Sequence, residues 1–282
     1  MTGVHVCHDA LDDRQRGDRV FAGDLVIFAA VPGLGAFRDR VDQLVRDEFG
    51  TANPETAQFE LPRPAYTSAV RNVRQRVRAD TTAHGLLCAA LANAGVDTSA
   101  AYWDWVHLRV LPHGSEHASA GTGWHRDTWS SNVHAQTNWW TPIYPITTGR
   151  ALRFAIEHWS EPVANTSDDW SPRAVKAQQH NESSERTAVP VIPEPLTDLR
   201  HVRELCVVVQ PGDLLCFSGT HLHASVPNES GLARFSVEVR TVHQADIDTG
   251  RGAPNIDSHA PSTRYRWFHH VEHGTPVTGP AA

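Results

Sequence analysis

Hydrophobic positions in the first third of the chain recur mostly at helical spacing. In residues 36–49 the spacing of Phe, Val and Leu predicts an amphipathic helix, and residues 81–94 predict a second that ends at Gly95. The very basic stretch 66–79 also predicts a helix, which we expect to present a solvated face. A strand is expected earlier, at residues 20–29, after a Gly-Asp turn. The N-terminal third therefore predicts a mainly helical region.

Beyond residue 102 the pattern changes to short segments that alternate between apolar and polar positions. The alternation is cleanest where Phe235, Val237 and Val239 share one side of a strand. Short strands separated by Gly- and Pro-rich turns indicate a sandwich or barrel. We therefore predict a mainly β fold with flanking helices, namely a jelly-roll core behind an N-terminal helical buttress. The expected strands are 103–111, 133–141, 151–156, 205–210, 213–218 and 234–242.

A length of 282 residues suits one domain with a large core. The aromatic and basic patch 264–268 is expected either to pack against the barrel or to form a homodimer contact. We predict a buttress at about 1–104, a core at about 105–245, a polar lid-like insertion at about 160–195 and a tail at 246–282.

Composition narrows the class of protein. A net charge of −7 argues against nucleic acid as a main partner. No apolar run approaches the ~20 residues of a membrane span, and the polar first residues lack the apolar region of a signal peptide. Four cysteines without a C-x-x-C pair indicate reduced thiols. We expect a cytoplasmic protein that acts on a small molecule.

Histidine followed two positions later by a carboxylate occurs three times, against about two matches expected by chance from the composition. Only one of these pairs lies in the strand-rich region, where Trp124 and Trp129 flank it and can exclude water. The three pairs are His125/Asp127, His180/Glu182 and His270/Glu272.

His125 and Asp127 can face one point, because residues i and i+2 of a strand share a side. Arg126 between them is expected to point away. A further imidazole from His221 or His223 would complete two histidines and one carboxylate, the facial triad of non-haem Fe(II) oxygenases. Strand alternation cannot separate these two histidines, because they too are i and i+2.

Arg234 follows His223 by 11 residues and shares its side of the strand with Ser236. A guanidinium fork near a hydroxyl suits bidentate binding of a carboxylate. Arg240, on the same side, is the second candidate for that role. On the preceding strand Gln136, Asn138 and Trp140 share one face, and we expect them to line the pocket; Trp139 takes the core side.

Taken together, these segments resemble the phytanoyl-CoA dioxygenase-like branch of the Fe(II)/2-oxoglutarate oxygenases. The resemblance spans residues 105–242 and departs from the family where Ala155-Ile156-Glu157-His158 stands in place of Gly-Ser-His. It rests on Trp124-His125-Arg126-Asp127, Gly212-Asp213-Leu214-Leu215-Cys216-Phe217, His223-Ala224-Ser225-Val226-Pro227-Asn228-Glu229-Ser230 and Arg234.

The resemblance implies a double-stranded β-helix, or cupin-like jelly roll, in which His125, Asp127 and His223 hold Fe(II). It implies that Arg234 binds 2-oxoglutarate with help from Ser236. We place Gln136 and Asn138 with the cofactor-binding candidates, and simple packing is their alternative role.

The implied activity is that of an Fe(II)- and 2-oxoglutarate-dependent dioxygenase, which uses O₂ to hydroxylate, desaturate or cyclise a small organic molecule. The carboxylate of Asp127 argues against halogenation, which needs room for halide at that position. Four tryptophans between residues 124 and 140 favour a bulky substrate, and we expect a role in bacterial secondary metabolism. Two alternatives stay open: a cupin-like metal enzyme that does not use 2-oxoglutarate, and a non-catalytic binding protein on the same fold.

Overall fold

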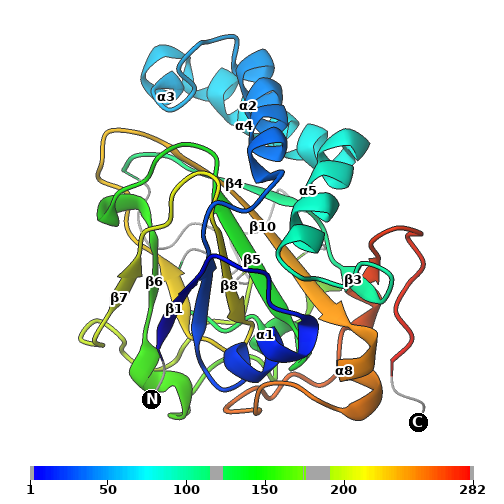
Figure 1. Ribbon diagram of the computed structural model, residues 1–282. Helices are drawn as coiled ribbons and strands as arrows, with labels where there is room; N and C mark the ends of the chain where they lie inside the picture. The colour runs from blue at the N-terminus through cyan, green and yellow to red at the C-terminus, as the bar shows by residue number, and fades with distance from the viewer. Residues whose placement is uncertain (1–2, 115–122, 174, 176–190, 280–282) are drawn as a thin grey trace.

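The computed structural model describes residues 3–114, 123–173, 175 and 191–279. Two β-sheets carry the fold, and a group of helices stands together at one end of the larger sheet (Figure 1). The strands are β1 (Val4–Cys7), β2 (Leu25–Phe28), β3 (Ala101–Trp103), β4 (His107–Leu111), β5 (Thr137–Pro142), β6 (Leu152–Phe154), β7 (Leu205–Val207), β8 (Leu214–Ser218), β9 (His223–Ser225), β10 (Arg234–His243) and β11 (His269–His270). The α-helices are α1 (Asp13–Val20), α2 (Leu34–Phe49), α3 (Ala57–Glu60), α4 (Arg63–Ala79), α5 (Thr81–Asn93), α6 (Thr128–Ser131) and α8 (Gln244–Thr249).

The larger sheet has the order β1-β2-β8-β5-β10-β3-β11, and β4 pairs with the first half of β10 on the same side as β3. The smaller sheet has the order β7-β6-β9. Strand β10 is the longest, and it pairs with β5 along one edge and with β4 and β3 along the other. The mainly β character with flanking helices is confirmed.

Alternation along β10 divides the protein into two apolar regions, as its sequence predicts. Phe235, Val237 and Val239 face the helices, where the ring of Phe235 lies 5.7 Å from that of Phe49 on α2. The opposite side of the sheet faces β6 and β7, and a second cluster there includes Trp140, Phe154 and Phe217. The polar side of β10 therefore opens into the space between the two sheets.

The expected strand 103–111 is wrong as a single element, because it is interrupted between β3 and β4. Asp104 turns inward there: its carboxylate accepts the backbone N–H of Arg240 and pairs with the Arg240 guanidinium. Trp105 is left 42% exposed at the break. A buried ion pair from another strand thus overrides an alternation that is regular in the sequence.

The N-terminal region also contributes strands to the larger sheet. The expected strand 20–29 is shorter than predicted, since α1 occupies residues up to Val20 and β2 begins at Leu25. Helix α1 begins with a capping box, in which the Asp12 carboxylate accepts the Gln15 backbone N–H and the Gln15 side chain accepts that of Asp12. That D-x-x-Q spacing is visible in the sequence and could have located the helix.

Other strands are also shorter than expected: β5 begins at Thr137 rather than 133, β6 covers Leu152–Phe154, and β7 covers Leu205–Val207. The expected helices 36–49 and 81–94 appear as α2 and α5, and the basic helix as α4. Much of the predicted lid lies outside the described residues. Its first part is tied to the tail, because Val163 donates to Asp257 and Asn165 to the Asp257 carbonyl.

The tail folds back onto the strand region rather than standing apart from it. Phe268 is fully buried and packs with Val133, Val242 and Ile247. Packing within the protein, the first of the two expectations for patch 264–268, is therefore observed at Phe268, while the homodimer contact stays a prediction.

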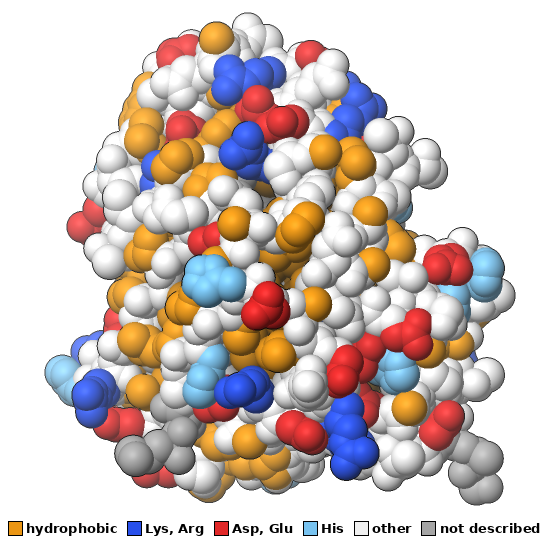
Figure 2. All heavy atoms as spheres, viewed as in Figure 1, with side chains coloured by type: hydrophobic (Ala, Val, Ile, Leu, Met, Phe, Trp, Pro, Cys, Tyr) orange, Lys and Arg blue, Asp and Glu red, His pale blue; other side chains and the backbone are white. Residues whose placement is uncertain are grey.

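None of the helices in the described ranges has the length and apolar character needed to cross a bilayer. On the face seen in Figure 2, acidic, basic and histidine side chains are intermingled, with hydrophobic side chains exposed between them. No single charge dominates that face.

Candidate metal centre

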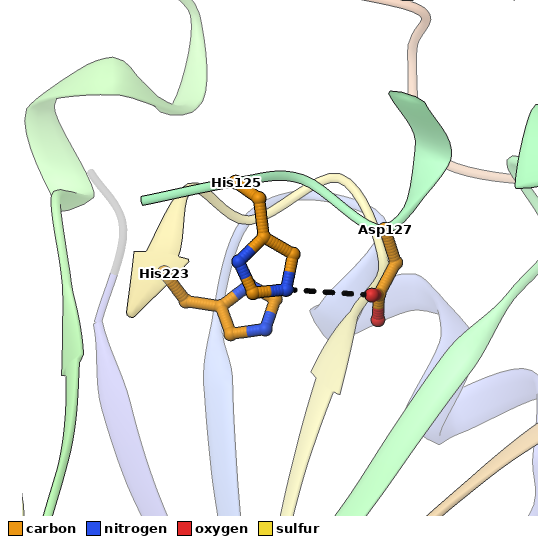
Figure 3. Close-up of side chains that lie close together, drawn as sticks. All are labelled: His125, Asp127 and His223. Atoms are coloured by element: carbon orange, nitrogen blue, oxygen red, sulfur yellow. Dashed lines mark ion pairs between the residues drawn. The ribbon is translucent and has the colours of Figure 1, made fainter. Parts of the chain in front are cut away.

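Two segments far apart in the sequence bring three ligand-type side chains together between the sheets. His125 and Asp127 precede α6, and His223 is the first residue of β9 (Figure 3). The backbones of His125 and His223 exchange two hydrogen bonds of 3.0 Å, which hold the two segments in register. The possible ligand atoms of the three side chains all lie within 4.8 Å of one another. This is the one such cluster found within the described ranges.

Both imidazoles are oriented by the same local contact. The Nδ1 atom of His125 lies 2.8 Å from the carbonyl oxygen of Gly123, and that of His223 lies 2.9 Å from the carbonyl oxygen of His221. Each Nδ1 therefore carries the proton and donates it, which leaves the lone pair of Nε2 for a metal. Burial lowers the pKa of both rings, that of His223 to about 4, so both are neutral near pH 7.

The two oxygens of Asp127 have different surroundings. Oδ2 accepts hydrogen bonds from the Gln136 amide, the Asn138 amide and Nε of Arg240. Oδ1 accepts one from Nη2 of Arg240 and lies 3.7 Å from Nε2 of His125. Because Oδ2 already has three donors, Oδ1 is the oxygen available to a metal. The geometry favours monodentate ligation, which leaves more positions open for other ligands.

Arg240, the second candidate for carboxylate binding, is paired with carboxylates of the protein itself. It forks onto Asp127 and also pairs with Asp104 and Glu238 at 3.1 and 2.7 Å, so it is engaged in holding the ligand carboxylate. Burial has the largest effect and raises the pKa of Asp127, but the positive charge of Arg240 together with smaller effects of His223 and His125 brings the net pKa below the usual value. The only sequence sign of this role is that Arg240 shares a side of β10 with Glu238.

Gln136 and Asn138 do share one face of the region around β5, but both amides point at Asp127. Trp140 lines the cavity, whereas Trp139 lies in the helix-facing core, where its Nε1–H donates to Thr241. Trp129 is also buried in the structure and donates to Asp257. Of the four tryptophans, only Trp140 is among the cavity-lining residues.

Arg126 points away from the triad, as expected, but it is fully buried. Its guanidinium pairs with Asp257 of the tail at 3.0 Å and donates to the carbonyl oxygens of Thr220 and His158. Thr220 belongs to the loop that leads to His223. Arg126 thus ties the two ligand-bearing segments and the tail together from behind.

The position of Arg234 suits the binding of a negatively charged ligand. Its side chain is buried; Nη1 donates to the carbonyl of Ala151 at 3.1 Å and Nη2 to the hydroxyl of Ser225 at 2.9 Å. No carboxylate in the described ranges pairs with it, and its Nε has no hydrogen-bond partner there. Burial lowers its pKa to about 10, with a smaller effect from Arg109, so it stays cationic at neutral pH. A buried cation without an anion is unfavourable, which points to an anionic ligand.

Ser236, the next residue on that side of β10, has a buried hydroxyl without a hydrogen-bond partner among the described residues. The sequence-predicted set therefore lies together between the two sheets. His125, His223 and Arg234 line one cavity of about 610 Å³, which is within the range of small-molecule sites.

The remaining histidine candidates are accounted for. The ring of His221 lies between the carbonyl oxygens of Ser218 and Gly23, at 3.1 and 3.0 Å, and its centre is 4.5 Å from that of the Trp159 ring. His221 is thus not part of the cluster, whereas His223 is. His270 contacts the carbonyl of Ser99, away from the triad. The pair His180/Glu182 lies outside the described residues.

No family model matches this chain, and no curated protein matches it. Among solved structures, the epimerase SnoN in complex with Fe³⁺, alpha ketoglutarate and nogalamycin RO is 13% identical, covering 93% of this chain and 95% of SnoN with a TM-score of 0.44. AviO1 from Streptomyces viridochromogenes Tue57 is 17% identical, covering 63% of this chain and 61% of AviO1 with a TM-score of 0.33. EvdO2 from Micromonospora carbonacea var. aurantiaca, complexed with 2-oxoglutarate, is 14% identical, covering 68% and 65% with a TM-score of 0.34.

The match to AviO1 thus spans less than two thirds of that protein. All three TM-scores are too low to assign a fold or an activity to this chain, so the assignment below depends on the geometry of its own residues.

Proposed function

We propose that this protein is an Fe(II)- and 2-oxoglutarate-dependent oxygenase that hydroxylates, desaturates or cyclises a small organic molecule. One observation carries the proposal: the two histidines of a His-Asp-His cluster line the same cavity as Arg234, a buried guanidinium that pairs with no carboxylate among the described residues. When 2-oxoglutarate chelates a metal through its 2-oxo acid end, its distal carboxylate is left to pair with a cation, and Arg234 is placed to supply it.

The donor set fits the metal. Two neutral imidazoles and one monodentate carboxylate suit Fe(II) in the facial arrangement, with the remaining positions open. When bound, the iron and 2-oxoglutarate would supply the oxidation of the substrate by O₂. His125, Asp127 and His223 would hold the iron. Arg234 would hold the distal carboxylate of 2-oxoglutarate, with Ser236 beside it.

Gln136, Asn138 and Arg240 would act on the centre through Asp127. Their donors hold the carboxylate so that it presents Oδ1 to the metal. Such supporting groups typically change metal affinity or activity about 10- to 100-fold when removed.

We further infer that the two facing sheets are the two halves of a double-stranded β-helix, and that the chain is akin to the phytanoyl-CoA dioxygenase-like oxygenases. The motif order and the inward side of β10 support this. A cytoplasmic tailoring step in bacterial secondary metabolism is the setting we propose. Efficient turnover of a primary-metabolism substrate such as a fatty acyl-CoA would contradict that setting.

The test is anaerobic absorbance of the metal-free protein after addition of Fe(II), with and without 2-oxoglutarate. We expect a weak visible charge-transfer band that needs both additions. Arg234→Ala should require much more 2-oxoglutarate for the same band, by about 10- to 100-fold, because a charged hydrogen-bonding partner is lost. Arg234→Lys, which keeps the charge but not the fork, should fall between the two.

Arg203→Ala is the matched control, because Arg203 is exposed and lies outside the cavity lining. Iron binding without the band in wild type would favour a cupin-like metal enzyme that does not use 2-oxoglutarate. Failure to bind iron with the fold intact would favour a non-catalytic binding protein.

A further inference from the structure

One wall of the cavity is formed by α4, the basic helix that the sequence suggested would be a solvated face. Tyr66, Val70, Arg74 and Arg78 are spaced four residues apart, so they form one stripe along the helix, and all four line the cavity. Strand β4 contributes His107 and Arg109 to the same lining. The expected solvated face is therefore exposed at Arg74 and Arg78, but it also forms part of the cavity lining, whereas Arg76 pairs with Glu48 outside the cavity.

Arg74 and Arg78 have no carboxylate partner within the described ranges. The guanidinium of Arg74 donates to the backbone carbonyl of Val110 at 3.3 Å. That of Arg78 lies 3.9 Å from the centre of the Trp105 ring. A stacked guanidinium still donates along its edge, so its N–H groups remain available to an anion.

Positively charged side chains outnumber carboxylates on this wall. Burial lowers the pKa of Arg74, and the positive charge of Arg109 lowers it further. Arg109 is itself paired with Glu238 at 3.3 Å, the one acidic side chain in the cavity lining. Four arginines therefore line this cavity in a protein whose net charge is −7. An anion between Arg74 and Arg78 would relieve that repulsion.

We propose that Arg74 and Arg78 bind an anionic group of the organic substrate, a carboxylate or a phosphate, and so set which molecules reach the metal centre. That the bound anion belongs to a substrate rests on the proposed oxygenase function, whereas the anion site itself does not. Arg234 is a separate site, since it is buried next to β6 and β9 while Arg74 and Arg78 are exposed on α4.

The experiment is calorimetric titration of the full chain with three probes: phenyl phosphate, hydrocinnamate and the neutral hydrocinnamamide. Each titration is done anaerobically with Fe(II) and 2-oxoglutarate present, and again without them. With 2-oxoglutarate bound, the co-substrate site no longer competes for the probes. The variants are Arg74→Gln, Arg78→Gln and the double variant. Arg71→Gln is the matched control, because it removes the same charge from α4 outside the cavity lining.

We expect the anionic probes to bind more tightly than the amide. Each single variant should weaken anion binding about threefold to tenfold and the double variant further, while Arg71→Gln stays within about twofold. The tighter of the two anions identifies the group as phosphate or carboxylate.

Equal binding of amide and anions, no binding of either anion, or equal weakening by Arg71→Gln would overturn the proposal. So would anion binding that 2-oxoglutarate abolishes, because the probes would then occupy the co-substrate site. Absence of the charge-transfer band together with arginine-dependent anion binding would instead remove the oxygenase function and leave the anion site standing.

Discussion

Charged side chains are paired differently in two regions of the molecule: around Asp127, and on the cavity wall formed by α4. Around Asp127, the part we call the base, Arg240, Asp104 and Glu238 form a network of buried and half-buried ion pairs, of which Glu238 reaches the cavity lining. On the wall, Arg74 and Arg78 are exposed to the cavity and have no carboxylate partner among the described residues. In the proposed oxygenase, this network would orient the Asp127 carboxylate before a metal binds, whereas the wall would gain a negatively charged partner only from a ligand. The side chains around Asp127 are thus preorganised by the protein, whereas the arginines of the wall have charges that a ligand could pair with.

The largest expected effect is loss of the metal centre. Asp127→Ala or His223→Ala should weaken Fe(II) binding by about 100-fold or more, since two ligands remain of three. Metal binding is measured by calorimetry under anaerobic conditions, with circular dichroism to confirm the fold. His201→Ala, at an exposed histidine, should bind iron like wild type. Retention of tight iron binding by either ligand variant would mean that the metal sits elsewhere.

The second-largest effect is expected when the ion pairs of Arg240 are removed. Arg240→Gln should lower the free energy of unfolding by roughly 3–5 kcal/mol, because it leaves buried carboxylates without their cation. Added Fe(II) or Zn(II) should raise the melting temperature of this variant less than that of wild type, because loss of the Arg240 donors to Asp127 weakens metal binding. Urea titration and thermal melts provide both numbers. An Arg240→Gln variant as stable as wild type would show that these ion pairs do not stabilise the fold.

A third test uses pH. Burial lowers the pKa of His221 and of His223 to about 4, against about 6.5 in an unfolded chain. The unfolded state therefore binds more protons between these values, so stability is full above about pH 6.5 and falls as pH drops toward 4. The loss should reach up to roughly 3 kcal/mol per histidine in the metal-free protein. A constant unfolding free energy from about pH 7 to about pH 5 would contradict this burial.

The smallest expected effect is on the wall. Arg74→Gln should change the free energy of unfolding by no more than about 0.5 kcal/mol, because it removes no ion pair. The same chemical denaturation that detects Arg240→Gln checks it. A loss comparable to that of Arg240→Gln would erase the contrast between base and wall and make Arg74 a structural residue.

The helices and the main strands were accessible from sequence because their evidence is local. Residues 36–49 and 81–94 repeat apolar positions at helical spacing, and 234–242 alternates at strand spacing. The interruption at Asp104 was not accessible, because its cause is a contact with Arg240, more than a hundred residues away. Helix α1 was missed although its capping box is local.

By itself, the sequence determined which residues of β10 face inward and which face outward. It also supplied an imidazole at His125 and a carboxylate two residues later at Asp127. Strand alternation alone could not separate His221 from His223 or Arg234 from Arg240, and the preference for His223 and Arg234 rested on the resemblance. The tertiary structure gives the members of each pair different surroundings: backbone carbonyls face both ring nitrogens of His221, and carboxylates engage Arg240. Those partners come from distant segments, so only the folded chain brings them within hydrogen-bonding distance.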